Sequence, residues 1–229
     1  MKINQFISEA LSCSRRETDR LIKADLVAIN GEVCTHGTIV TENDIVTIDG
    51  KTIEKEDKEK IYIAFHKPVG ITCTAADHID GNIIEYINHP ERIFPVGRLD
   101  KASEGLILLT NDGRIANQIL HGDYEHEKEY IVTVDKPFAD WFIDGMSRGV
   151  KIKDGITKQC KVTRVNSSTF RIILTQGMNR QIRRMSRAFG YTVTKLKRVR
   201  IMNIKLDGLE DGEWRNVTVQ ELQELLKQL

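Results

Sequence analysis

The chain has 229 residues, of which 40% are hydrophobic and 29% are charged, and its formal net charge is +1. This composition is typical of a globular protein of one or two domains, and the sequence lacks the run of eighteen apolar residues that would predict a membrane-spanning helix. Its four cysteines are scattered without a C-x-x-C pair, which argues against a metal site or a disulfide framework. We expect a cytoplasmic monomer with reduced thiols and no membrane association.

Two helices are predicted at the start of the chain. Apolar side chains at helical spacing indicate a helix over residues 2–11. Ser14 and Glu17 form a capping box, which marks a helix N-terminus, so a second helix is expected from there to about Ala24. One face of this second helix carries Arg16, Arg20 and Lys23.

Short strands and a charged segment follow the helices. The Asn30-Gly31 turn predicts a hairpin between residues 27–29 and 32–34, and residues 45–48 predict another strand. Residues 51–60 are nearly all charged with both signs balanced, so we expect an exposed linker there. The predicted organisation is a module at 1–50, a linker at 51–60 and a larger domain at 61–229.

The larger domain alternates short strands and helices, which fits a mixed sheet with helices packed on it. The expected strands are 61–65, 105–110, 128–134, 160–165, 169–175 and 199–206. The expected helices are 83–88, 114–120, 137–146, 179–188 and 219–229. Thr218 and Glu221 form a capping box at the last helix, whose apolar stripe of Leu222, Leu225, Leu226 and Leu229 predicts packing on the core.

The small net charge hides an uneven distribution of charge along the chain. Residues 155–206 contain thirteen Lys or Arg and no Asp or Glu, whereas residues 207–229 contain six acids. A solvated face explains a short basic run, but a stretch of this length favours a surface that meets a polyanion.

One acid lies in a glycine-flanked loop that leads into a buried strand. The sequence from Gly97 to Gly105 is G-R-L-D-K-A-S-E-G, and it runs into L-I-L-L-T and the turn Asn111-Asp112-Gly113. Asp100 is therefore presented on a loop that a rigid element holds, a common position for catalytic groups. An arbitrary loop aspartate is more often a turn or cap residue, so the flanking motif has to decide between the two interpretations.

The pattern G-R-L-D-x-x-[ST]-x-G-L-x-x-L-T-N-D-G resembles the catalytic motif of the RsuA-type pseudouridine synthases. The phrases K-A-S-E-G and T-Q-G-M-N-R-Q-I-R-R-M look closest to the RluF branch of that family, which modifies large-subunit ribosomal RNA. The resemblance implies an α+β fold with a mixed, mainly antiparallel sheet flanked by helices. It also implies that Asp100 is the catalytic carboxylate and that no cofactor is used.

Two more residues take their expected roles from the same resemblance. Tyr130 follows the family's K-x-Y pattern and would stack on the target base, although a core tyrosine is the simpler interpretation from strand patterning alone. Arg183 lies between the apolar and basic faces of helix 179–188 and matches G-x-N-R-Q-I-R-R-M. By that match it pairs with Asp100, which would hold the carboxylate ionised and oriented.

The substrate expected from the resemblance is structured RNA. Residues 1–50 are similar to the S4 RNA-binding domain in the patterns S-R-R-E, V-x-I-N-G and D-x-V-x-I-D-G. The candidate RNA contacts are Arg15, Arg16 and Arg20 in this module, and Lys67, Arg98, Asn179, Arg180, Gln181, Arg184, Lys195 and Lys197 in the larger domain. Arg198 and Arg200 continue the last cationic run, which a solvated strand edge explains almost equally well.

Three questions stay open at this point: the RNA substrate, the class of protein and the chemical role of Asp100. The RNA substrate can be large-subunit (23S) ribosomal RNA, small-subunit (16S) ribosomal RNA or a tRNA. The chain can be an RNA-binding protein without catalysis, or a glycosidase-like hydrolase, for which Glu104 is the only local candidate for a second acid. Asp100 can attack the sugar as a nucleophile or remove a proton from it.

Overall fold

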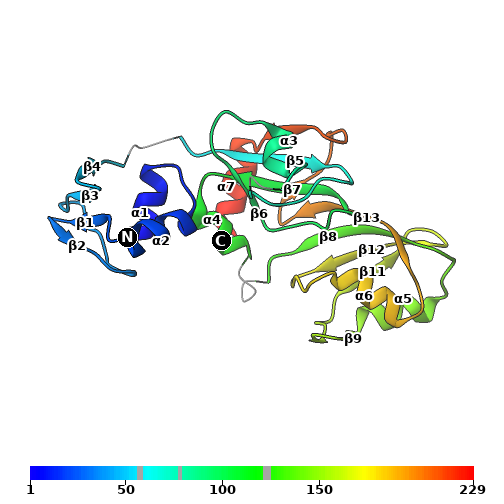
Figure 1. The fold of residues 1–229 in the computed structure, drawn as a ribbon. Helices are drawn as coiled ribbons and strands as arrows, with labels where there is room; N and C mark the ends of the chain where they lie inside the picture. Colours follow the sequence, from blue (N-terminus) through cyan, green and yellow to red (C-terminus); the bar gives the residue numbers. More distant parts are fainter. Residues whose placement is uncertain (56–58, 77–78, 121–124) are drawn as a thin grey trace. The chain divides into compact units, whose positions relative to one another are not determined.

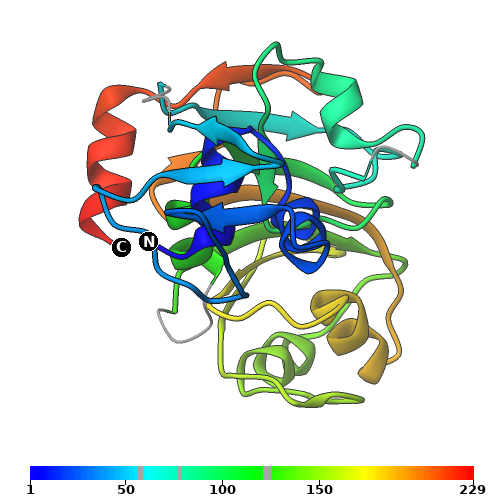
Figure 2. The same ribbon diagram turned by 60° about the vertical axis from the view of Figure 1, so that its left-hand side comes forward.

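The computed structural model describes residues 1–55, 59–76, 79–120 and 125–229, which fold as two compact units, Met1–Glu59 and Lys60–Leu229 (Figure 1). In the first unit, helices α1 (Ile3–Ala10) and α2 (Arg15–Lys23) pack on a sheet of order β2-β1-β3-β4 (Figure 2). Its strands are β1 (Val27–Ile29), β2 (Glu32–Val33), β3 (Val46–Ile48) and β4 (Lys51–Ile53). The Ser14 hydroxyl accepts a hydrogen bond from the Glu17 main-chain nitrogen, as expected for the start of α2.

Strand β4 corrects the predicted linker. Asp49 and Gly50 have positive φ angles of 48° and 73°, so the chain reverses there and Ile53 pairs with Val46. Ile53 also packs on the apolar core of the unit. The prediction of a linker over 51–60 is therefore wrong for Lys51–Ile53, and residues 56–58 of that segment lie outside the described residues.

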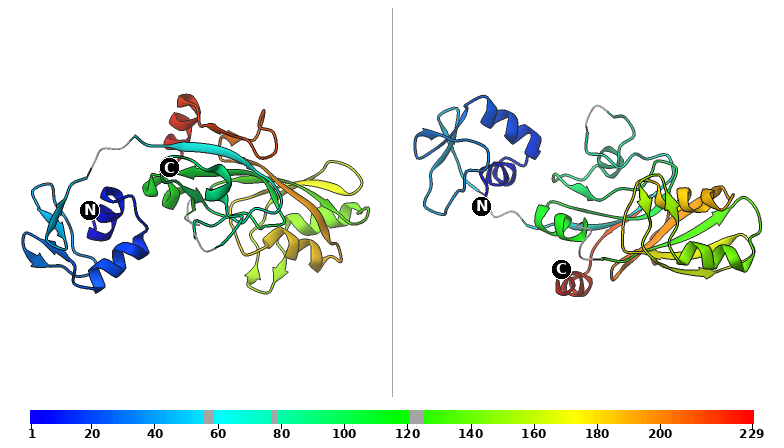
Figure 3. Two further views of the ribbon diagram at one scale, coloured as in Figure 1. Left: turned by 45° about the horizontal axis from the view of Figure 1, so that its top comes forward. Right: turned by 90° about the horizontal axis from the view of Figure 1, so that it is seen from below.

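The second unit is built on a nine-stranded sheet in its described residues, with the order β11-β12-β8-β13-β7-β5-β15 and with β14 and β6 paired to β13 and β7 (Figure 3). The strands are β5 (Tyr62–Lys67), β6 (Phe94–Val96), β7 (Glu104–Thr110), β8 (Lys128–Val134), β11 (Lys161–Arg164), β12 (Thr169–Leu174), β13 (Val193–Ile201), β14 (Ile204–Lys205) and β15 (Trp214–Asn216). Strands β9 (Lys151–Ile152) and β10 (Gly155–Ile156) form a separate hairpin. Among the described strand pairs of the large sheet, β7 with β13 is parallel and the others are antiparallel.

Helices cover the sheet and complete its core. They are α3 (Ile83–Ile87), α4 (Gly113–Leu120), α5 (Asp140–Ser147), α6 (Gln181–Ala188) and α7 (Val219–Lys227). Helices α4 and α7 contribute to one apolar cluster with β5, β6 and β7, and α3 packs on a second cluster formed by the alternate residues of β5 and β7. The predicted α+β fold with a mixed, mainly antiparallel sheet is confirmed. None of the helices in the described part of the chain has the length and hydrophobicity needed to cross a bilayer.

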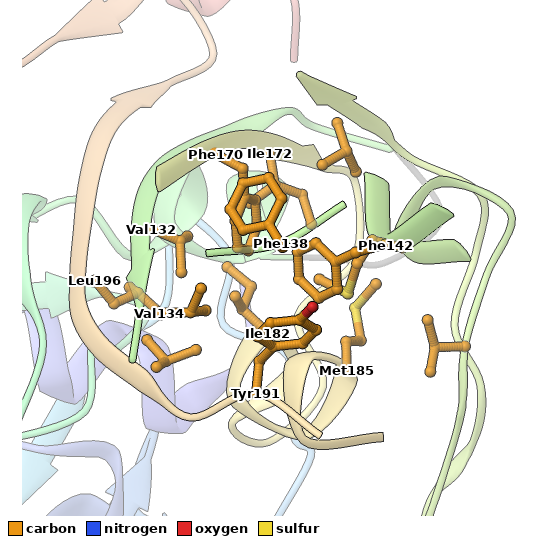
Figure 4. Close-up of a cluster of buried hydrophobic side chains, with 14 of the residues drawn as sticks. Val132, Val134, Phe138, Phe142, Phe170, Ile172, Ile182, Met185, Tyr191 and Leu196 are labelled. Carbon is orange, nitrogen blue, oxygen red and sulfur yellow. The ribbon is translucent and has the colours of Figure 1, made fainter. Parts of the chain in front are cut away.

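An aromatic cluster fixes α6, the helix that carries Arg183, against the sheet (Figure 4). Phe142 from α5 lies with its ring centroid 4.6 Å from that of Tyr191 and 5.4 Å from that of Phe170. Ile182 and Met185 of α6 are buried in the same cluster. Such close packing transmits small displacements, so the position of α6 depends on this core.

Two predicted elements differ from the structure in informative ways. The predicted strand 199–206 is instead β13, which begins at Val193, followed by a turn at Met202 (φ 51°) and the short strand β14. The last helix begins with the predicted capping box, but Leu226 is 48% exposed, so the apolar stripe is narrower than expected.

Glu221 in that capping box predicts a pH dependence of stability. Both carboxylate oxygens accept hydrogen bonds of 2.7 Å from Arg215, which lowers the pKa of Glu221 from 4.5 to about 2. A carboxyl group with a lowered folded-state pKa stabilises the fold fully above its unfolded pKa and loses this effect as pH falls through the folded one. Urea midpoints of wild type and Glu221→Gln should therefore differ most above about pH 4.5 and converge toward pH 2. A difference independent of pH would contradict this assignment.

Candidate active site

A cleft of about 590 Å³ opens in the second unit where the Asp100 loop, β8, β13 and the start of α6 meet. Among the described residues that line it, Asp100 is the only carboxylate. The basic side chains along the lining are Arg98, Lys128, Arg180, Arg183 and Arg198. The cleft is therefore strongly electropositive, as expected for a site that binds a polyanion.

Main-chain hydrogen bonds hold the loop that presents Asp100. The Ser103 nitrogen donates to the Asp100 oxygen at 2.9 Å, which closes a turn directly before β7 begins at Glu104. The Gly70 nitrogen donates to the Lys101 oxygen at 2.8 Å, and the Leu99 nitrogen donates to the Cys73 sulfur at 3.4 Å. The loop is anchored on both sides of Asp100, whose side chain remains 37% exposed toward the cleft.

Arg183 approaches Asp100 from α6. Its Nε lies 3.8 Å from the Asp100 Oδ2, and its two terminal nitrogens donate to the main-chain oxygens of Val193 and Ala102 at 3.0 Å each. A further hydrogen bond of 3.1 Å goes to the Ser103 hydroxyl. Burial lowers the pKa of Arg183, and the nearby Asp100 acts in the opposite direction. The structure thus brings together the two groups that the sequence paired, with the guanidinium fixed by three acceptors.

Tyr130 lies in the wall of the cleft on β8. It is half-buried and packs against two apolar clusters, that of α5 and α6 and that of α3. Its neighbours across the sheet are Ile172 on β12 and Arg198 on β13. Its ring is thus supported from behind and borders the same cleft as Asp100.

Several predicted RNA contacts are accessible. Arg98, Asn179 and Arg180 are exposed and line the cleft. Lys195 is exposed and pairs with Glu104 at 3.2 Å, and Lys197 is half-buried on the same strand. In the first unit, the basic side chains of α2 are all exposed, namely Arg15, Arg16, Arg20 and Lys23.

Lys67 is a correction to the predicted RNA contacts. Its side chain is fully buried, and its ammonium donates to the main-chain oxygen of Pro68 at 2.6 Å. Burial lowers the pKa of Lys67, whose neighbouring charges include Asp100. The prediction that Lys67 touches RNA directly is wrong, because the side chain lies beneath the site.

Gln181 and Arg184 are largely engaged within the protein. Gln181 is buried, and its side-chain oxygen accepts a hydrogen bond of 3.0 Å from the Met178 nitrogen at the start of α6. Arg184 pairs with Asp154 and donates to the Asn179 side chain at 3.1 Å. These contacts shape the rim of the cleft and leave less of either side chain for RNA than the sequence suggested.

Sequence reasoning overlooked Lys128 and Ser103 in the site. Lys128 precedes Tyr130 by two residues on β8, so the twofold periodicity of a strand places it on the same face, a signal that was available. Ser103 is buried, and no local pattern reveals its partner: the motif specifies Ser or Thr at this position, but the hydrogen bond joins it to Arg183, 80 residues away. Arg198 and Arg200 do not lie on a solvated strand edge. Arg198 donates to the main-chain oxygen of Leu106, and Arg200 donates to the carboxylate of Glu129.

The arrangement suits attack by one carboxylate on a nucleotide in a cationic cleft. It does not suit a hydrolase with paired carboxylates, because Glu104 pairs with Lys195 and is absent from the described lining of the cleft. Within the described residues, no group of three His, Cys, Asp or Glu side chains has the geometry of a metal site.

Comparisons with known proteins agree with this geometry. Residues 61–188 match the model of the RNA pseudouridylate synthase family, and residues 1–46 match the S4 domain. The dual-specificity RNA pseudouridine synthase RluF of Salmonella typhi is 52% identical over 99% of this chain and 78% of its own length. The ribosomal large subunit pseudouridine synthase B of Bacillus subtilis is 34% identical over 98% of this chain and 95% of its own.

A solved structure supports the same assignment. A crystal structure of a pseudouridylate synthase superposes with a TM-score of 0.73 at 27% identity and covers 98% of this chain and 99% of its own. The predicted resemblance to the RsuA-type enzymes and their RluF branch is thus confirmed. The chain belongs to the RNA pseudouridylate synthase family, the enzymes that isomerise uridine in RNA to pseudouridine.

Proposed function

We propose that Asp100 is the catalytic carboxylate of this enzyme, with Arg183 as its partner and Tyr130 as the stacking surface for the target base. The observation that carries the proposal is the position of Asp100 as the only carboxylate among the described residues of a cationic cleft, 3.8 Å from Arg183. A target base has to leave its stack to reach such a cleft, and an aromatic wall with polar neighbours suits a flipped base.

The isomerisation breaks the bond between N1 and C1′, turns the base and joins C5 to C1′. Asp100 takes part either by bonding to C1′ as a nucleophile or by removing the C2′ proton. In both cases it acts as a carboxylate, and the Arg183 guanidinium, 3.8 Å away, attracts and orients that carboxylate. The reaction neither oxidises nor reduces the substrate.

Arg183→Ala should impair turnover more than RNA binding. Without the guanidinium, Asp100 loses the charge and the support that orient it, and misplacement of a catalytic group by about 1 Å can cost about 100-fold in rate. We expect kcat to fall by about that factor, with the RNA Kd changed by less than about threefold. The comparison is single-turnover kinetics and filter binding for Arg183→Ala and for Arg187→Ala, an exposed arginine of the same helix outside the lining of the cleft. A loss of affinity alone would make Arg183 a phosphate contact.

The proposed substrate is a stem-loop of large-subunit ribosomal RNA. The Bacillus subtilis relative is named for the large ribosomal subunit, and the RluF relatives are named as dual-specificity enzymes, so a second RNA is part of the proposal. The S4 module would contribute phosphate contacts through the exposed arginines of α2.

Mapping of pseudouridines tests this substrate. Ribosomal RNA and tRNA transcripts are incubated with the enzyme, and new pseudouridines are located in each. We expect a site in the large-subunit RNA, and fewer modified molecules with a variant carrying alanine at Arg15, Arg16 and Arg20. New pseudouridines confined to small-subunit RNA or to tRNA would refute the large-subunit assignment while leaving the role of Asp100 intact.

A further inference from the structure

Arg198 on β13 is a buried arginine whose charge has no acidic partner within the described residues. Only 3% of the residue is exposed. Its Nε donates to the main-chain oxygen of Leu106 at 2.6 Å, and its Nη1 donates to that of Arg98 at 3.5 Å. Its Nη2 is closed off from solvent and meets no hydrogen-bond acceptor in the described part of the chain. Burial of an unpaired guanidinium is unfavourable where an apolar side chain could fill the space, which points to a role for the charge in the cleft that Arg198 lines.

A β-bulge gives Arg198 this position. Strand β13 pairs with β8 so that Arg198 lies opposite Tyr130 and Arg200 lies opposite Glu129, with a shift of register between them. Arg200 donates from Nε to Glu129 at 2.7 Å and so has the acidic partner that Arg198 lacks. Residues two apart would normally share a face, and the bulge separates these two arginines. Arg200 therefore contacts the carboxylate of Glu129, and Arg198 lies beside Tyr130 in the cleft.

Lys128 adds a second cation to the same region. It shares the cleft face of β8 with Tyr130, and its ammonium donates to the main-chain oxygen of His126 at 3.2 Å. Burial lowers the pKa of Lys128, and the charge of Arg198 lowers it further. Lys128 and Arg198 line the same cleft, so their like charges repel one another. An arriving group with negative charge would relieve that repulsion.

The reaction itself supplies such a group. When the N1–C1′ bond breaks, its electron pair remains with the base, while C1′ bonds to the Asp100 carboxylate or C2′ gives its proton to it. The detached uracil carries a negative charge shared between N1 and its carbonyl oxygens. Later C5 bonds to C1′, which releases the Asp100 carboxylate from C1′ or, on the other route, follows return of the proton from Asp100 to C2′. This bond removes the negative charge from the base. The C5 proton then leaves and N1 is protonated. Fixed donors in a water-poor site stabilise such transient charge effectively.

We propose that Arg198 donates a hydrogen bond to the uracil and stabilises the negative charge that develops on it as the N1–C1′ bond breaks. The inference rests on the proposed function, because it takes the base to be stacked on Tyr130 beside Asp100. By this proposal Arg198 is a further catalytic residue. The positive charge of Lys128 in the same cleft also favours the negative charge on the base.

Leaving-group dependence tests the proposal. The target RNA is prepared with uridine or with 5-fluorouridine at the target position, whose fluorine withdraws electron density and makes the base a better leaving anion. Single-turnover loss of the substrate nucleoside and the RNA Kd are measured for wild type, Arg198→Met and Arg198→Lys. Lys205→Met is the control, because it removes an exposed cation from β14, outside the lining of the cleft.

We expect Arg198→Met to lower the rate about 100-fold on uridine RNA. On 5-fluorouridine RNA, the ratio of the wild-type rate to the variant rate should be smaller by a factor of at least about three. The Kd should stay within about twofold, Arg198→Lys should recover part of the rate, and Lys205→Met should resemble wild type. The ratio of rates on the two substrates does not depend on the fraction of folded enzyme, so partial unfolding cannot imitate the result. If the variant lost the same factor in rate on both RNAs, Arg198 would have only a structural role. If only the RNA Kd changed, Arg198 would be a phosphate contact. Either outcome overturns the proposal. Activity retained by Asp100→Asn would instead refute the proposed function.

Discussion

Asp100→Asn is expected to abolish pseudouridine formation, with a fall in rate of at least about 1,000-fold. Asparagine has nearly the same shape as aspartate, but it can neither bond to C1′ as a carboxylate nor remove a sugar proton. The loop should keep its form, because its anchors are main-chain hydrogen bonds from Ser103 and Gly70 and the contact with Cys73. The measurement is release of tritium from C5 of labelled uridine in the target RNA, together with the RNA Kd.

RNA binding should change by less than about twofold, since one carboxylate among five basic side chains contributes little to attraction of the backbone. The matched control is Glu104→Gln, an acid four residues away that pairs with Lys195 and is absent from the described cleft lining. It should keep nearly full activity. Full activity of Asp100→Asn would exclude Asp100 as the catalytic group.

Gly105→Ala is expected to destabilise the second unit by about 3 kcal/mol. Gly105 has a φ of +110°, which L side chains rarely adopt, and a Cβ there would lie 2.2 Å from the main-chain oxygen of Arg198 and 2.5 Å from its nitrogen. Because both obstacles are backbone of a central strand, they cannot move aside as a side chain would. For a unit of this size the loss corresponds to a fall in Tm of roughly 6–12 °C.

Gly155→Ala separates backbone strain from steric overlap. Gly155 also has a positive φ, of +129°, but a Cβ added there would meet no atom of the described chain within 4 Å. Strain alone should cost about 1 kcal/mol at this position. Calorimetric scans of both variants provide the comparison, and similar losses at the two positions would show that β7 and β13 can separate without a large penalty.

The elements with clear local patterns were predictable from the sequence. Strand β8 was expected at residues 128–134 and occurs at Lys128–Val134, because residues 130–134 are all β-branched or aromatic, which is typical of a strand. The capping box of Thr218 and Glu221 depends on residues three positions apart, so it too could be identified locally.

The elements that depend on distant partners could not be predicted. The cationic residues of β13 suggested RNA contacts or a solvated strand edge. Lys195 and Arg200 instead have acidic partners on β7 and β8, and Arg198 is buried between those strands. Lys67 was assigned to RNA from the family resemblance. Its burial, which is rare for a lysine, follows from packing beneath a loop more than thirty residues away. For the site, motif resemblance gave Asp100, Tyr130 and Arg183. Strand periodicity could have added Lys128, while the contact of Ser103 with Arg183 became evident only in three dimensions.

The parallel pairing of β7 with β13 has a consequence for how the enzyme folds. It joins strands whose paired residues, Gly105 and Arg198, are 93 positions apart, and in the described sheet it links the half that presents Asp100 to the half that presents Tyr130. Closing so long a loop is entropically slow, and contacts of this kind form late compared with hairpins and helices. A nascent chain therefore completes its hairpins before it has a catalytic centre, and enzymatic competence should appear only in the final kinetic phase of refolding.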